Sequence, residues 1–155
     1  MEVSAQALKR FPLFATVPDE KLGNVVPLIK VLHYRTGNHI FEEGTEGDKL
    51  FLVSDGSVRI SKFIDGVGEE ALSVLKSGAY FGEMSIIDSG PRSATALAHT
   101  DCEVWEISRD EFIAILQSDR DLSFHVLWNL LKTLSHRLRE TNEKIKAFFA
   151  MSTGF

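Results

Sequence analysis

The chain has 155 residues, of which 44% are hydrophobic and 25% are charged, and its net charge is −5 at pH 7. This length and composition predict a single globular domain, residues 1–155, with a sizeable core. The N-terminal residues lack the apolar stretch of a signal peptide, and no apolar run approaches the roughly 20 residues that a bilayer requires. We therefore expect a cytoplasmic protein with no membrane partner. The one cysteine, Cys102, cannot form an internal disulfide, which suits a reducing compartment.

The charge is unevenly distributed along the chain. Residues 1–119 carry 11 basic and 19 acidic side chains, a net of −8, whereas residues 120–155 carry 6 basic and 3 acidic ones, a net of +3. Because nucleic-acid binding depends on neutralising phosphates, direct contact with DNA or RNA is not expected. The basic C-terminal segment is interpreted as a solvated helix face. An acidic domain that binds an anion needs a local positive site.

The first two of three zones lie within residues 1–107. Residues 1–27 predict short helices, one over residues 5–11 and another beginning near Pro18, whose ring suits a first helical turn. Residues 28–107 contain short β-rich runs separated by glycine-bearing turns. This pattern predicts a mainly β fold with flanking helices, namely a β jelly roll or double-stranded β-helix. The predicted strands cover residues 29–34, 39–43, 49–54, 57–64, 70–75, 94–98 and 102–107.

Residues 108–150 form the third zone and predict C-terminal helices. Ser108 and Glu111 make a capping-box pattern ahead of an apolar run. A second start at Ser118 and Asp119 leads into a long helix that ends at about Phe149. Its apolar positions recur at spacings close to those of a coiled-coil seam, so we expect a homodimer through this helix. The seam comprises Leu127, Leu130, Leu134, Leu138, Ile145 and Phe148.

Residues 80–95, with the sequence YFGEMSIIDSGPRSAT, interrupt the series of strands. Gly82 permits close backbone approach, and residues 83–88 can form one or two helical turns whose free N–H groups favour an anion. The following Gly-Pro pair turns the chain so that Arg92 and Ser93 open the next strand. The segment therefore predicts a site for a compact phosphate between the helix start and Arg92.

Glu83 and Arg92 indicate the kind of ligand. The guanidinium fork of arginine suits phosphate oxygens. A lone phosphate would be repelled by a neighbouring carboxylate, but a sugar phosphate also offers hydroxyl groups from which Glu83 can accept hydrogen bonds. The pair therefore suggests a ligand with hydroxyl and phosphate close together. An ordinary salt bridge between Glu83 and Arg92 is the alternative.

The string FGEMS…PRSAT resembles the phosphate-binding cassette of the cyclic-nucleotide-binding domain family, which includes kinase regulatory subunits and bacterial catabolite activators. The glycine pattern from Gly37 through GTEGD to Gly56, and the PLF string at Pro12, resemble the same family. The resemblance covers essentially the whole chain. It implies a regulatory domain rather than an enzyme, with no catalytic residue, no metal and no cofactor. The implied ligand is cyclic AMP, with cyclic GMP as the alternative, because Ser93 is compatible with both.

The resemblance also implies roles for individual residues. Glu83 and Gly82 would hold the ribose 2′-hydroxyl, and Arg92 and Ser93 would contact the cyclic phosphate. The long helix resembles the dimerisation helix of the catabolite activators, so some of its residues would reach the base. The other implied ligand-binding residues are Phe81, Met84, Ser85 and Ala94 in the cassette, Ile60 and Leu72 against the base, Arg137 near Glu83, and Thr141 and Asn142 as base readers, one of them from the partner subunit.

The polar residue Thr141 interrupts an otherwise apolar seam, where an unsatisfied hydroxyl would be unfavourable. This supports a role in ligand binding independently of the resemblance. The alternative is a polar seam residue that sets the specificity of helix pairing.

Two other classes of function are less consistent with the sequence. A metal-dependent enzyme on a β roll needs two histidines and a carboxylate from neighbouring strands, and His33, His39 and His99 show no such pairing. A pure interaction domain would be expected to lack Glu83 or Arg92. We therefore expect ligand-linked rearrangement of the helices. Catabolite activators continue into a DNA-binding unit, whereas this chain ends at Phe155, so its output would be an unknown partner protein, or it is the sensor piece of a larger regulator or enzyme.

Overall fold

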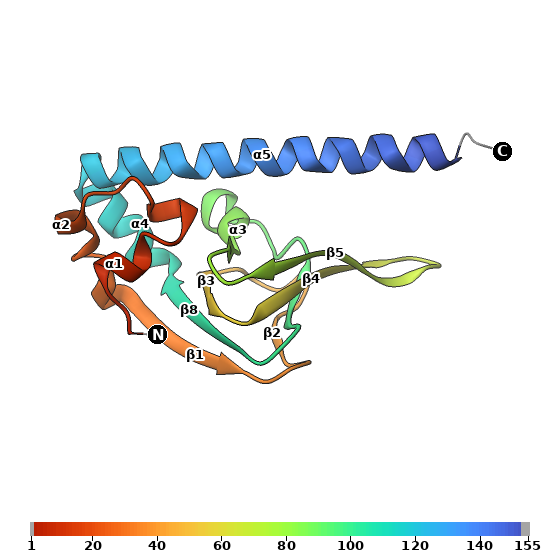
Figure 1. Cartoon of the computed structure of the whole chain (residues 1–155), viewed down its shortest axis with the longest axis horizontal. Helices are drawn as coiled ribbons and strands as arrows, with labels where there is room; N and C mark the ends of the chain where they lie inside the picture. The colour runs from red at the N-terminus through yellow and green to blue at the C-terminus, as the bar shows by residue number, and fades with distance from the viewer. Residues whose placement is uncertain (1, 153–155) are drawn as a thin grey trace.

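The computed structural model describes residues 2–152, which form a β jelly roll with short helices at one end and a long helix along one side (Figure 1). Within these residues, the strands make two four-stranded antiparallel sheets, which confirms the predicted fold class. The first sheet has the order β1 (Ile29–Tyr34), β8 (Cys102–Ser108), β3 (Lys49–Asp55) and β6 (Tyr80–Phe81). The second has the order β2 (His39–Phe41), β7 (Thr95–Ala98), β4 (Ser57–Ile64) and β5 (Gly68–Lys76).

All the predicted strands are present, with two differences. The short strand β6 was not predicted, because two residues cannot show an alternating pattern; they pair with Phe51 and Leu52 of β3. The prediction that Arg92 and Ser93 open a strand is wrong, since β7 begins only at Thr95. The backbone of Arg92 instead exchanges hydrogen bonds with the loop at residues 44–45, which keeps it out of the sheet.

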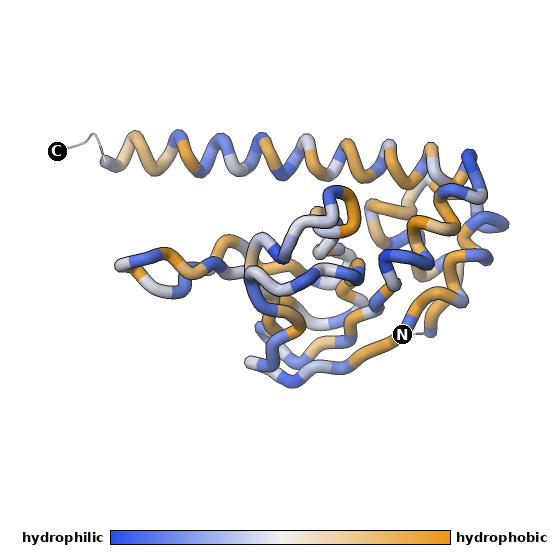
Figure 2. The backbone as a smooth tube through the Cα atoms, turned by 180° about the vertical axis from the view of Figure 1, so that it is seen from behind, coloured by the Kyte–Doolittle hydropathy of each residue, from blue (hydrophilic) through white to orange (hydrophobic). Residues whose placement is uncertain are grey.

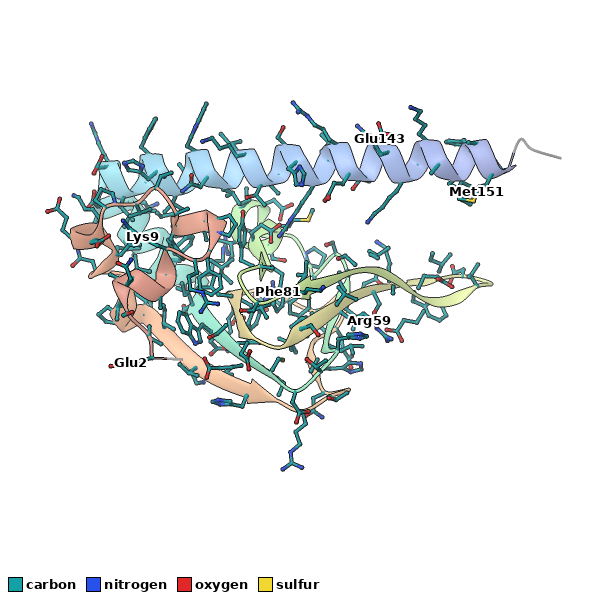
Figure 3. All side chains as sticks on the ribbon, viewed as in Figure 1. Glu2, Lys9, Arg59, Phe81, Glu143 and Met151 are labelled. Atoms are coloured by element: carbon teal, nitrogen blue, oxygen red, sulfur yellow. The ribbon has the colours of Figure 1, made fainter. Side chains whose placement is uncertain are left out.

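The two inner strands of the first sheet, β3 and β8, are buried on both faces, which explains their nearly continuous apolar character. In β3, Leu50 and Leu52 pack against the helices, and Phe51 and Val53 face the interior of the roll. Figure 3 shows Phe81 in the middle of the roll. The jelly roll therefore has one core between its sheets and a second core beneath the helices. The inner core comprises Phe51, Val53, Val58, Phe81, Ala96, Ala98, Cys102 and Val104.

Short helices at the N-terminus cover the outer face of the first sheet. They are α1 (Ala5–Leu8), η1 (Pro12–Phe14), α2 (Asp19–Leu22) and η2 (Val26–Leu28). The first helix is shorter than predicted. Hydrogen bonds that span three residues rather than four, from Arg10 N to Ala7 O and from Phe11 N to Leu8 O, end the α-helix there. The buried side chains of this layer complete the core beneath the helices.

The C-terminal helices are α4 (Arg109–Ser118) and α5 (Arg120–Ser152). The predicted capping box does not form: Ser108 makes no side-chain cap bond, because it is still the last residue of β8 and pairs with Lys49. Asp119 does cap the long helix as expected, since its Oδ1 accepts from the N–H groups of Asp121 at 3.1 Å and Leu122 at 3.0 Å. No helix within residues 2–152 is both long and apolar enough to cross a membrane.

The predicted seam of α5 divides between two faces of the helix. Leu130 and Leu134 pack on the core, whereas Leu127, Leu138, Ile145 and Phe148 are exposed. Apolar residues recur along the whole of α5, including the part that extends past the roll (Figures 1 and 2). One exposed set recurs at spacings of four, three, seven, seven and four residues, and we call it the outer stripe. It comprises Phe124, Trp128, Leu131, Leu138, Ile145 and Phe149.

Candidate ligand-binding site

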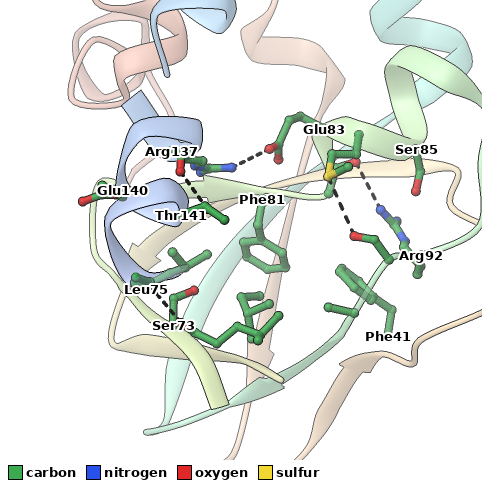
Figure 4. Close-up of a pocket in the computed structure, with 17 residues that line it drawn as sticks. Phe41, Ser73, Leu75, Phe81, Glu83, Ser85, Arg92, Arg137, Glu140 and Thr141 are labelled. Atoms are coloured by element: carbon green, nitrogen blue, oxygen red, sulfur yellow. Dashed lines mark hydrogen bonds and ion pairs between the residues drawn. The ribbon is translucent and has the colours of Figure 1, made fainter. Parts of the chain in front are cut away.

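A cavity of about 360 Å³ lies between the second sheet, the short helix α3 (Glu83–Asp88) and α5 (Figure 4). This volume suits a small organic ligand. The helix α3 forms where the sequence predicted it. Every predicted ligand-binding residue except Asn142 lines this cavity. Those residues are Ile60, Leu72, Phe81, Gly82, Glu83, Met84, Ser85, Arg92, Ser93, Ala94, Arg137 and Thr141.

Gly82 lets the cassette approach the first sheet closely. Its φ is +82°, a left-handed conformation that favours glycine, and α3 begins at the next residue. A Cβ atom at this position would lie 2.8 Å from Arg92 Nη1 and 3.0 Å from Lys49 O. The close approach that the sequence predicted therefore places the cassette backbone against the guanidinium of Arg92.

Arg92 is 3% exposed and lies at the end of the cavity that the cassette forms. Its Nη1 donates to Gly82 O at 3.2 Å and its Nη2 donates to Lys49 O at 2.9 Å. The guanidinium carbon lies 4.1 Å from the centre of the Phe41 ring, a cation–π contact. Its Nε is buried without a partner. Burial lowers the pKa of Arg92, although the carboxylates of Asp48 and Glu83 oppose this. The site thus holds a buried cation that is fixed in place and has an N–H donor, at Nε, without an acceptor in the protein.

The loop between β2 and β3 holds Arg92 from the other side. The N–H of Gly44 donates to Arg92 O, and the N–H of Arg92 donates to Thr45 O, both at 2.8 Å. A Cβ atom on Gly47 would overlap the side chain of Ser85 and lie 3.0 Å from Arg92 Nε. This position therefore has room only for glycine. The loop and the cassette are packed directly against each other there.

The long helix is joined to the cassette by Arg137. Its Nη1 donates to the carboxylate of Glu83 (Figure 4). Its Nη2 donates to Tyr80 O at 2.6 Å. Glu83 is 6% exposed, so its carboxylate is largely removed from water, whereas the side chain of Arg137 is 34% exposed. The salt bridge between Glu83 and Arg92 that the sequence left open does not form. Glu83 is instead neutralised by a residue of α5.

The far end of the cavity is formed by β4, β5 and α5. Thr141 Oγ1 donates to Arg137 O at 2.9 Å, and Lys144 Nζ donates to Leu72 O at 3.3 Å. Asn142 does not line this cavity, because one residue turns a helix by about 100° and places it in line with the outer stripe. Because one of the two base readers was expected from the partner subunit, a contact of Asn142 with the ligand stays a prediction.

The structure adds residues to the site that the sequence did not single out. Lys144 lies three residues after Thr141 and seven after Arg137, so helical periodicity alone could have placed it on the same face. Ser73 pairs with Ile60 across β4 and β5, a register that the sequence does not reveal. The added lining residues are Phe41, Ser73, Leu75, Glu140 and Lys144.

These features define a ligand-binding module: a jelly roll, a helical cassette between β6 and β7, and a helix over the cavity. Residues 31–119 match the family described as cyclic nucleotide-binding domain, and the chain belongs to this family. It is thus a cyclic nucleotide-binding regulatory domain.

Three similar proteins illustrate the relationship. The cyclic AMP receptor protein of Thermus thermophilus is 36% identical over 135 residues, which cover 87% of this chain and 61% of that protein. A crystal structure of a cyclic nucleotide-binding domain from Methylobacillus flagellatus has a TM-score of 0.82 and 29% identity, covering 92% of this chain and 80% of that one. The regulatory domain of Toxoplasma gondii PKA with cAMP has a TM-score of 0.67 and 31% identity, and the match covers 72% of this chain and 42% of that chain. This chain spans about 61% of the length of the first curated relatives it matches.

Proposed function

We propose that this domain binds cyclic AMP and couples its binding to the position of α5. The observation that carries the proposal is the contact of Arg137 with Glu83 and Tyr80 O, which joins α5 to the cassette beside the cavity. A ligand that touches both elements favours the arrangement in which they are together, by its differential affinity. A coupling free energy of about 1–3 kcal/mol is ordinary for such a switch.

The cyclic phosphate is assigned to the end of the cavity at Arg92. An arginine has five N–H donors, and the Nε of Arg92 is buried without an acceptor. Ser93 adds a hydroxyl at the same end of the cavity. Because an unpaired buried donor is unfavourable, a phosphate oxygen that reaches it gains a charge-assisted hydrogen bond. The ribose 2′-hydroxyl then lies at Glu83, whose carboxylate can accept from both the ribose and Arg137.

The base is assigned to the end formed by Ile60, Leu72 and Thr141. The hydroxyl proton of Thr141 is used by Arg137 O, so its oxygen offers lone pairs to a donor in the ligand. The exocyclic group at position 6 is an amino donor in adenine and a carbonyl acceptor in guanine. A threonine oxygen that meets this position therefore favours cyclic AMP over cyclic GMP.

Calorimetric titration of the purified chain with cyclic AMP, cyclic GMP and cyclic di-GMP tests the proposal. We expect the tightest binding for cyclic AMP, and a stabilisation of about 2.7 kcal/mol when its free concentration is 100 times Kd. No heat with any of the three nucleotides would refute ligand binding. Tighter binding of cyclic GMP would overturn the assignment of the base.

Replacing Arg137 tests the coupling between α5 and the cassette. In Arg137→Met, the Glu83 carboxylate stays buried without its cation, and we expect the affinity for cyclic AMP to fall at least about tenfold. Arg139→Met is the matched control, since Arg139 lies outside the cavity on the same helix. Calorimetry measures the affinity of both variants for cyclic AMP, and circular dichroism verifies that they are folded. Equal affinities in the two variants would contradict the coupling.

We also propose that the domain is a homodimer through the outer stripe of α5. Leu131 and Leu138 are 58% and 61% exposed in one chain, seven residues apart, as in a coiled-coil seam. Leu138→Glu would place two like charges opposite each other and is expected to give a monomer. Ala147→Glu adds the same charge on another face of α5 and should leave the dimer intact. Sedimentation velocity at several concentrations measures the oligomeric state of the wild type and both variants. A wild-type chain that stays monomeric at every concentration would refute the dimer.

The output of the switch is assigned to a partner protein or a further domain rather than to nucleic acid. Residues 1–119 carry a net charge of −8, which opposes contact of the roll with phosphates. The helix α5 extends past the roll and is the element whose position the ligand would alter (Figure 1). A partner that reads the arrangement of α5 would therefore respond to ligand.

A further inference from the structure

The mouth of the cavity carries a methionine whose sulfur contacts a cassette serine. Met84 is the second residue of α3 and is 51% exposed. Its Sδ accepts a hydrogen bond from Ser93 Oγ at 3.8 Å, and both side chains line the cavity. A thioether is only a weak acceptor, so this contact leaves the serine hydroxyl available to a stronger one.

We propose that Met84 is an oxidation site that lowers the affinity of this cavity for cyclic nucleotide; the inference rests on the proposed function. The oxidant is hydrogen peroxide. The thioether sulfur attacks one peroxide oxygen, a sulfur–oxygen bond forms and the O–O bond breaks. The sulfur is oxidised to the sulfoxide by two electrons, and the other oxygen leaves as water after proton transfer within the peroxide. Methionine sulfoxide reductases reverse this modification.

The sulfoxide changes the side chain at the place where the phosphate is assigned. It replaces a weak acceptor with a polar S=O group whose oxygen is a good acceptor for the Ser93 hydroxyl. The hydroxyl is then withdrawn from the phosphate. The oxygen also carries a partial negative charge that repels an anionic ligand. Arg92 cannot compensate by moving outward, because two backbone carbonyls and the Phe41 ring hold its guanidinium.

Met151 provides an internal reference. Met84 and Met151 are the methionines within residues 2–152, and Met151 is 71% exposed near the end of α5, outside the cavity. Figure 3 shows Met151 far along α5 from the roll's centre at Phe81. Both residues are more than half exposed, but of the two only Met84 lines the site. Bound nucleotide should therefore slow the oxidation of Met84 and leave that of Met151 unchanged.

The test uses the whole chain, treated with hydrogen peroxide with and without cyclic AMP. Peptide mass analysis locates the added oxygen, and calorimetry measures the affinity before and after treatment in wild type, Met84→Leu and Met151→Leu. We expect oxidation to weaken cyclic AMP binding about tenfold, the value of one hydrogen bond, in wild type and Met151→Leu. Treatment with methionine sulfoxide reductase should restore the affinity for cyclic AMP. In Met84→Leu, the affinities before and after peroxide should be equal.

The outcomes separate this inference from the function on which it rests. Unchanged affinity after Met84 is fully oxidised would overturn the inference alone. An equal loss in peroxide-treated Met84→Leu would also overturn it, because the loss would then come from another residue. Absence of binding to untreated wild type would overturn the proposed function, and this inference with it.

Discussion

Arg92→Lys is expected to weaken the binding of cyclic AMP about 100-fold, which corresponds to about 2.7 kcal/mol. The guanidinium of Arg92 bonds to Gly82 O and Lys49 O, and its Nε, which has no partner in the protein, is the donor that we assign to the phosphate. A lysine ammonium is a single point with three donors, and it cannot span these carbonyls and a phosphate together. The loss therefore follows from geometry, although the positive charge is kept. Calorimetric titration measures it.

The control for this prediction is Arg59→Lys. Arg59 lies on β4 and pairs with Glu69 Oε1 at 3.2 Å, outside the cavity of the site. The Arg59→Lys variant should bind cyclic AMP with the affinity of the wild type. Circular dichroism of both variants verifies that they are folded. If folded Arg92→Lys kept the wild-type affinity, Arg92 would not be the phosphate-binding residue.

Gly47→Ala is expected to have the second largest effect, on both stability and binding. Its Cβ would overlap Ser85 and lie 3.0 Å from Arg92 Nε, so the loop must separate from the cassette. Overpacking of this kind costs about 1–3 kcal/mol of unfolding free energy. We expect the affinity for cyclic AMP to fall as well, because the displaced side chains line the site. Chemical denaturation measures the stability, and calorimetry measures the affinity.

Gly23→Ala is the matched substitution away from the site. Gly23 has a φ of −53°, and the nearest atom to its added Cβ is Glu20 O at 3.3 Å, so the change requires only a small adjustment. Its affinity for cyclic AMP should equal that of the wild type. A Gly47→Ala variant as stable and as tightly binding as Gly23→Ala would show that the contact between loop and cassette is unimportant.

The sequence alone was sufficient for the fold class, for most of the strands and for the cassette. Alternating apolar residues and glycine turns are local signals, because a strand buries alternate side chains and a turn needs particular backbone angles. The helix at Glu83, the close approach at Gly82 and the long helix after Asp119 follow from such local chemistry. Arg92 and Glu83 were also proposed as ligand-binding residues in this way, since a glutamate and an arginine nine positions apart are visible in one stretch of residues.

Tertiary structure decided which of these groups meet. Glu83 pairs with Arg137, 54 positions away, rather than with Arg92, because α5 packs back over the cassette. The seam of α5 divides between core and solvent, since a helix that covers a domain must direct one face inward, and periodicity does not say which. Ser108 does not cap α4, because the strand pairing of Lys49 holds it in β8. Contacts between distant residues depend on how whole elements pack, and no local pattern contains that information.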